Sequence, residues 1–484
     1  MTSGLATTAS VEAAVGPELA AAAAHGTAAA APLGLSAERV MATIRSAARG
    51  SAPGPSGLRM GHLWALAEDG HNALVGVVRL LATDAATTVV PAVASHALAG
   101  AEFLLLVKPE ASDADGVPRL RPIGMPETIR KLVAGWLARD LRASAAALMA
   151  PLQLGIGVPN ACERLLHALE AQLEVAPEEG VLLLDFENAF NLISRAAARA
   201  FVDRAFPSLT PHVAATCGGS LPAVYGWAAA RRGGDRGADG DGRDGRDETG
   251  DGGDSGVGDE DPPGLVDDDD DAHPPQWVPP PPARRVLTVE RGTQQGDPLG
   301  PFLHAAALML VLLRLARLHP AHAIDAFHDD VRAVGPVAGL GAVMASAARV
   351  GALVDAELSP TKCVAWSPGA SAVPPDLTAQ WRSEGVEQFS IPVGRHDFVA
   401  ARVAAMAAEH AAGVAAIVAL PEEELQTKLL LLRLCAGPRV TYALRSLPPD
   451  AGATLAAAVD ADVQRTVLYL LCDATDGAQV RAAL

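Results

Sequence analysis

The chain has 484 residues, 50% of them apolar, and carries a formal net charge of −18. Its length exceeds one ordinary domain and its apolar content is ample for a large core, which excludes a wholly disordered chain. The five cysteines have no Cys-x-x-Cys spacing and no pattern of histidine partners, which excludes a zinc knuckle and a disulfide framework. The acidic charge counts against nucleic-acid binding, for which a basic surface is the usual footprint.

Residues 1–36 are predicted to be a disordered, alanine-rich segment. They contain Glu12 and Glu18 but no lysine or arginine, which fits neither a secretory signal nor a transit peptide. The most apolar later stretch, residues 302–318, carries His304 and Arg314 and is short for a bilayer span. It is predicted to be a buried helix, and no membrane contact is expected.

A buried strand is predicted where the continuous apolar run of residues 181–184 leads to Asp185. Such a run is typical of a strand covered on both faces, and Asp185 would then project from the rim of the sheet. The alternative is that Asp185 caps the helix predicted to begin near Ser194.

Residues 229–283 are predicted to be a disordered insert before the strand-like segment 285–289. They are rich in Gly, Asp and Pro, so they cannot bury enough apolar surface to offset chain entropy. Residues 231–271 hold 16 acids and 5 arginines, a net charge of −11, and the remaining chain carries −7. The insert therefore accounts for most of the acidic charge.

Asp329 and Asp330 are adjacent within residues 326–335, where an apolar strand is predicted to turn back on itself. Neighbouring carboxylates on a half-buried hairpin repel each other unless a cation or hydrogen-bond donors compensate. Oxygen ligands of this kind suit Mg²⁺, and two such ions about 3.5–4 Å apart can hold the attacking and leaving oxygens of a phosphoryl transfer. The alternative is an ordinary turn, in which Asp is common.

After residue 400 the pattern becomes helical. Apolar residues recur at three- and four-residue spacing, which predicts helices over residues 401–420, 422–435 and 455–472.

Short motifs connect these elements in one fixed order. In chain order they are residues 50–58, 103–109, 119–131, 153–158, 185–191, 292–301, 326–335, 358–363 and 389–394. Together they resemble the reverse transcriptases of non-LTR retrotransposons, and the resemblance extends from about residue 47 to residue 400.

The resemblance implies an α/β right-hand polymerase fold. Its fingers would span residues 37–180, a palm with an antiparallel sheet would span 181–400 around the insert, and a helical thumb would span 401–484. The implied activity is RNA-directed DNA synthesis on an RNA template, with a DNA or RNA primer, deoxynucleoside triphosphates (dNTPs) and two Mg²⁺ ions, or Mn²⁺ in their place. The implied location is intracellular, and nuclear for a eukaryotic element; the oligomeric state stays open.

The resemblance also assigns the catalytic positions. Asp185, Phe186, Asp329 and Asp330 are the metal-binding residues that it implies. Lys362 would give a proton to the departing pyrophosphate, as a general acid.

Phe190 occupies the position at which an aromatic ring would lie under the sugar of the incoming nucleotide and exclude a 2′-hydroxyl. The alternative is a core aromatic beside Phe186. The other substrate contacts implied by the resemblance are Lys108, Arg121, Gln295 and Gly296.

Three residues depart from the family pattern. His328 replaces the small or aliphatic residue common before the two acids, Phe327 stands where many members have Tyr, and Ser56 stands where the motif usually has Asp. Two alternative functions stay open. One is a catalytically inactive retroelement relic that serves as a nucleic-acid- or protein-binding scaffold, and the other is an RNA polymerase, which Phe190 opposes.

Overall fold

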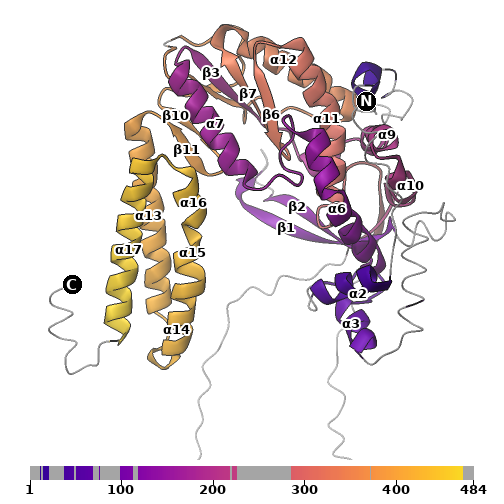
Figure 1. Cartoon of the computed structure of the whole chain (residues 1–484), viewed down its shortest axis with the longest axis horizontal. Coiled ribbons are helices and arrows are strands. Elements are labelled where there is room, and N and C mark those ends of the chain that lie inside the picture. Colours follow the sequence, from indigo (N-terminus) through magenta and orange to yellow (C-terminus); the bar gives the residue numbers. More distant parts are fainter. Residues whose placement is uncertain are drawn as a thin grey trace, which may run out of the picture.

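The computed structural model is a mixed α/β structure whose described residues form a five-stranded sheet, a four-stranded sheet and a two-stranded hairpin (Figure 1). Most of the expected disordered segments, 1–36 and 229–283, lie outside the described residues. The structure describes residues 37–47, 51–68, 99–112, 118–217, 221–225, 285–370 and 372–471, together with residues 11, 13, 15–20 and 76.

The five-stranded sheet has β3 (Glu179–Leu184) at its centre, with β7 and β8 antiparallel on either side. Leu182 and Leu184 of β3 pack into one hydrophobic core, and Val181 packs into the core on the opposite face. The strand predicted to be buried on both faces is therefore confirmed. The other strands, in sheet order around β3, are β6 (Ala323–Phe327), β7 (Asp330–Pro336), β8 (Val364–Trp366) and β9 (Gln380–Trp381).

Helices cover both faces of this sheet. The predicted helix at 302–318 is α11 (Gly300–Leu318), which is largely buried against α9 (Arg195–Ala205). Ser194 caps α9, since its side chain accepts a hydrogen bond from Ala197 N at 3.3 Å. The alternative role of Asp185 as the cap of this helix is wrong. Helices α7 (Ala161–Val175) and α12 (Leu340–Gly351) also pack on the sheet, whereas α8 (Ala189–Leu192) packs against α11 and α10 (Thr210–Cys217) packs against α9.

The second sheet has the order β2-β1-β4-β5. Strands β1 (Ala101–Ser112) and β2 (Pro118–Pro126) form a hairpin that contains most of the motifs at 103–109 and 119–131, and α6 (Thr128–Met149) follows it. Strand β4 (Leu221–Tyr225) runs parallel to β1 and pairs with β5 (Arg285–Val289). These two strands flank the acidic insert and lie in the range expected for the palm, 181–400. They nevertheless join the sheet of residues 101–126, so this sheet crosses the boundary that was expected at residue 180 between fingers and palm.

The C-terminal helices form a unit on one side of the molecule, opposite α2, α3 and α6, with the β1–β2 hairpin between them (Figure 1), and this unit shares a hydrophobic core with α7 and β3. The hairpin of β10 (Gly385–Gln388) and β11 (Ile391–Gly394) precedes this unit. Helices are confirmed in all three predicted stretches, although the first begins at His396. The C-terminal helices are α13 (His396–Val418), α14 (Leu425–Leu431), a π-helical turn (Leu432–Ala436), α15 (Gly437–Arg439), α16 (Thr441–Ser446) and α17 (Pro449–Leu471). On the opposite side, α2 spans Ala37–Ser46 and α3 spans Met60–Glu68.

Helical residues between 11 and 20 pack on the main core, which differs from the disorder expected for residues 1–36. Val11, Val15 and Leu19 are buried in the core that contains α11. The carboxylate of Glu18 pairs with Arg317 of α11 at 2.5 Å, next to Arg314. The spacing of four residues between the buried side chains places them on one face of a helix.

Three segments in the described part of the chain are long and apolar enough to cross a membrane: Gly300–Leu318, Val337–Val354 and His396–Val418. The first of them is mostly buried inside the protein. The absence of membrane contact stays a prediction.

Candidate functional site

The predicted acids lie at adjacent strand ends of the five-stranded sheet. Leu184 of β3 pairs with Val331 of β7, so the same antiparallel register places Asp185 across from Asp330. Phe327 pairs with Asp330 in the β6–β7 hairpin, which leaves His328 and Asp329 as its two turn residues. The order of strands therefore brings together acids that are more than 140 residues apart in the sequence.

The chain beyond β3 is held by the segment that carries Lys362. The carbonyl of Asp185 accepts a hydrogen bond from Ser359 N at 2.8 Å, and the amide of Asp185 donates to Cys363 Sγ at 3.4 Å. Lys362 Nζ lies 3.3 Å from Asp185 Oδ1, and both side chains are 45% exposed. The structure thus places Lys362 directly at the first acid.

A polar cavity of about 340 Å³ lies between these strand ends and the β1–β2 hairpin. Most of the predicted site residues line it. Asp330 and Gly296 are not among the lining residues, and the side chain of Lys108 lies outside the described part of the structure. The residues that line it are Arg121, Asp185, Phe186, Asn188, Ala189, Phe190, Asn191, Gln295, Asp329 and Lys362.

The carboxylates interact electrostatically. Desolvation, followed by the negative charges of Asp329 and Asp185, raises the pKa of Asp330 to about 6. Three mutually repelling carboxylates with oxygen donors fit a divalent cation such as Mg²⁺. Within the described residues no three His, Cys, Asp or Glu side chains are already gathered into a metal cage, and Lys362 supplies the nearest positive charge to Asp185.

The raised pKa of Asp330 predicts that the metal-free protein is less stable against unfolding at high pH than at low pH. A carboxyl with a raised pKa in the folded state binds more protons there than in the unfolded state, so stability falls as the pH rises from about 4 to about 6. We expect Asp330→Asn to raise the unfolding temperature by about 1–3 °C at pH 8 after allowing for solvent screening. The measurement is thermal unfolding with a chelator, and the gain should vanish at pH 4; a loss of stability at pH 8 would contradict it.

Phe190 lines the cavity and its ring is supported from behind. It stacks on His304, with ring centroids 4.4 Å apart and planes at 20°. Burial lowers the pKa of His304 to about 3, so the supporting ring is neutral at pH 7. The ring therefore contacts buried His304 on one side and lines the cavity on the other, and its place under the sugar of a nucleotide stays a prediction.

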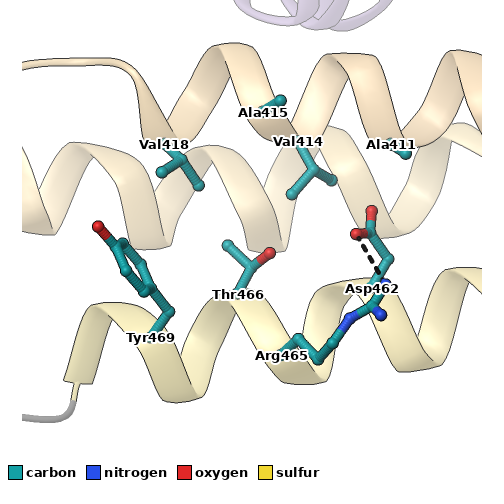
Figure 2. Close-up of a pocket in the computed structure, with 8 residues that line it drawn as sticks. All are labelled: Ala411, Val414, Ala415, Val418, Asp462, Arg465, Thr466 and Tyr469. Carbon is teal, nitrogen blue, oxygen red and sulfur yellow. Dashed lines mark ion pairs between the residues drawn. The ribbon is translucent and has the colours of Figure 1, made fainter. Parts of the chain in front are cut away.

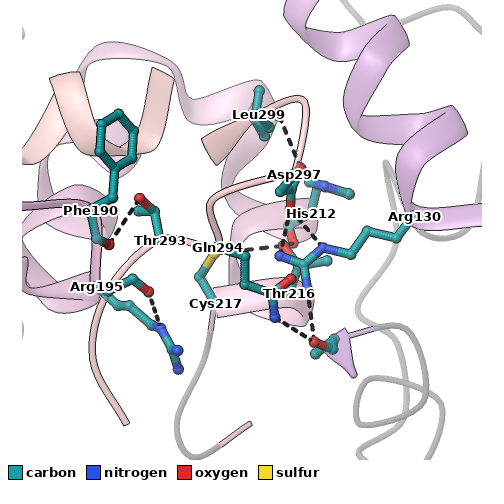
Figure 3. Close-up of polar contacts among 12 residues, drawn as sticks. Arg130, Phe190, Arg195, His212, Thr216, Cys217, Thr293, Gln294, Asp297 and Leu299 are labelled. Atoms are coloured by element: carbon teal, nitrogen blue, oxygen red, sulfur yellow. Dashed lines mark hydrogen bonds and ion pairs between the residues drawn. The ribbon is translucent and has the colours of Figure 1, made fainter. Parts of the chain in front are cut away.

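The loop that carries Gln295 is held by a backbone hydrogen bond and by one buried ion pair, that of Arg130 with Asp297 (Figure 3). Gly124 N donates to Gln295 O at 2.6 Å. Gly296 has φ +115°, and a Cβ there would lie 2.1 Å from Gly124 O, so this glycine serves the close approach of two chains. Arg130 pairs with Asp297 at 2.6 Å, and both side chains are 2% exposed.

Two departures from the family pattern have structural counterparts. Ser56 donates its hydroxyl to Glu127 Oε2 at 2.6 Å, a contact in which a second carboxylate would be repelled. His328 has φ +55°, in the left-handed region, and burial lowers the pKa of its imidazole. Its ring lies edge-on to Phe327, with centroids 4.8 Å apart.

Sequence reasoning missed the role of Gln153. Its side chain is fully buried and bonds to the turn that carries Asp329. It also missed Asn188 and Asn191, which line the cavity. A fully buried glutamine has no signal of its own in the sequence, but all three residues fall inside motifs that were identified.

A larger cavity of about 560 Å³ lies between α13 and α17 (Figure 2). Its walls are mainly small and apolar side chains, with one ion pair between Asp462 and Arg465 at 3.7 Å. Its lining has one carboxylate, Asp462, and no group of converging carboxylates. The smaller polar cavity is therefore the better candidate for catalysis.

No protein-family model and no curated protein matches this chain. The assignment of the site therefore depends on the sequence resemblance and on the geometry of its residues.

Proposed function

We propose that this protein is an RNA-directed DNA polymerase that extends a primer with dNTPs. The observation that carries the proposal is the single cavity lined by Asp185, Asp329, Lys362, Arg121 and Phe190, with acids at neighbouring strand ends. A nucleotidyl transfer requires carboxylates for cations, donors for phosphates and a surface for the sugar, and each class of side chain is present.

Each residue of the proposed site has a role that suits the chemistry of its side chain. Asp185, Asp329 and Asp330, with the Phe186 carbonyl, would hold Mg²⁺, which when bound stabilises negative charge on the reacting oxygens. Arg121 lines the cavity and would supply guanidinium donors for the polyphosphate. Lys362 is available as a proton donor for pyrophosphate once substrate phosphates compete for its ammonium. Gln295 faces the same cavity and would contact the templating pair.

The direct test is extension of a DNA primer on an RNA template with dNTPs or ribonucleoside triphosphates, with and without Mg²⁺. Extension that requires Mg²⁺ and dNTPs supports the proposal. A folded protein that incorporates neither nucleotide would overturn it.

Phe190→Ala is expected to relax the selection against ribonucleotides. Removal of the ring opens space beneath the sugar, so the ratio of kcat/KM for ribonucleotides to that for dNTPs should rise at least about tenfold, or roughly 1.4 kcal/mol. Phe190→Tyr keeps the ring and is the matched control. An unchanged ratio in Phe190→Ala would remove the argument against an RNA polymerase.

A catalytically inactive scaffold is the second candidate, and one contact favours it. The Lys362 ammonium lies against Asp185, where it can offset the charge of that acid without a metal. Template binding by the parent without any extension, and without change in Asp329→Asn, would support this candidate.

A further inference from the structure

Gln153 joins the end of α6 to the acid hairpin. It is 0% exposed, although glutamine is rarely buried completely. Its Oε1 accepts hydrogen bonds from His328 N at 2.8 Å and Gly155 N at 2.9 Å, and its Nε2 donates to His328 O at 2.9 Å. One side-chain amide therefore holds both backbone polar groups of the residue before Asp329.

The held backbone has an unusual conformation. His328 has φ +55°, which is uncommon for residues other than glycine and requires support from its surroundings. The residue after Gln153 also binds strand β6 just before this turn, because Leu154 N donates a hydrogen bond to Ala326 O at 2.8 Å. At Gly155 a Cβ would lie 2.7 Å from His328 N, so a side chain there would displace the turn.

We infer that Gln153 is a positioning residue that fixes the direction of Asp329 and Asp330 toward the cation site. The inference rests on the proposed function for its catalytic consequence, while the clamp itself is a property of the metal-free fold. The clamp binds only the main chain of residue 328, so it operates with a histidine as well as with a small residue at that position. Supporting hydrogen bonds behind metal ligands typically change metal affinity or activity by about 10–100-fold.

Two substitutions test the clamp. Gln153→Leu removes the three hydrogen bonds at similar volume. Gln153→Glu keeps one acceptor oxygen but places the second against the carbonyl oxygen of His328. Gln172→Leu is the matched control, because Gln172 donates a side-chain hydrogen bond to Glu179 at 2.7 Å, at the opposite end of β3.

The first readout is hydrogen exchange of the metal-free full-length protein, followed in peptides that contain His328. We expect exchange there to accelerate at least about tenfold in both Gln153 variants and to stay unchanged in Gln172→Leu. Unchanged exchange at His328 in a folded Gln153→Leu protein would overturn the clamp.

The second readout is the Mg²⁺ concentration that gives half of the maximal thermal stabilisation. It should rise at least about tenfold in the Gln153 variants relative to the parent and to Gln172→Leu. An unshifted midpoint would overturn the positioning role. If Mg²⁺ does not raise the unfolding temperature of the parent protein, the proposed metal site is overturned. The hydrogen-exchange experiment would still show whether Gln153 holds the turn at His328.

Discussion

Asp329→Asn is expected to reduce primer extension about a thousandfold or more without unfolding the protein. Asp329 lines the polar cavity and lies in the turn of the β6–β7 hairpin. Asparagine has nearly the same shape and also suits turns, but it lacks the charge that attracts a cation. Loss of about 4 kcal/mol of charge stabilisation in the transition state corresponds to this factor.

The measurement compares single-turnover extension rates of the parent and Asp329→Asn at equal Mg²⁺. Asp203→Asn is the matched control, because Asp203 bonds to Thr210 and Arg199 at the surface, away from the cavity. Full activity in a folded Asp329→Asn protein would exclude the carboxylate as a metal ligand. Equal losses in the two variants would point to a general defect of the preparation.

Arg130→Met is expected to lower the free energy of unfolding by about 3–5 kcal/mol. Arg130 bonds to Asp297 and to Ala99 O, and removal of its charge leaves Asp297 buried without a counterion. Because Asp297 lies two residues after Gln295, the loop at the cavity should also loosen. Urea unfolding of the full chain gives the change in stability.

The double variant Arg130→Met/Asp297→Asn should recover a large part of this loss. Asparagine keeps the acceptor oxygen for Leu299 N, which Asp297 Oδ1 binds at 2.9 Å, but introduces no buried charge. Arg199→Met breaks a partly exposed pair with Asp203 and should cost about 1 kcal/mol or less. A similar small effect of Arg130→Met would contradict the importance of the buried pair.

The parts of the site that follow from local chemistry could be predicted from the sequence. The apolar run before Asp185 and the adjacent acids at 329–330 are visible in short windows, and both lie at strand ends in the structure. The contact of Gln153 with His328 spans 175 residues and depends on how α6 meets the hairpin, so no local pattern reveals it.

At the N-terminus, composition and periodicity predict different structures. The alanine-rich content of residues 1–36 favoured disorder, but the four-residue spacing of Val11, Val15 and Leu19 is the pattern of a helix face. The sheet that β4 and β5 join could not be predicted from the sequence either, because the residues of a strand do not specify its neighbouring strands. The pairing of β4 with β1 joins residues more than 100 positions apart, and β5 then pairs with β4 across the acidic insert.

The pairing of Tyr225 with Arg285 makes the two ends of the acidic insert neighbours in one sheet. The 59 residues between them therefore leave and re-enter the sheet at neighbouring positions, and this would hold for a segment of any length. Closing a longer loop costs only about 0.6 kcal/mol for each doubling of its length. A longer segment, or a reporter domain, can therefore be inserted at this junction without any change in the polar cavity.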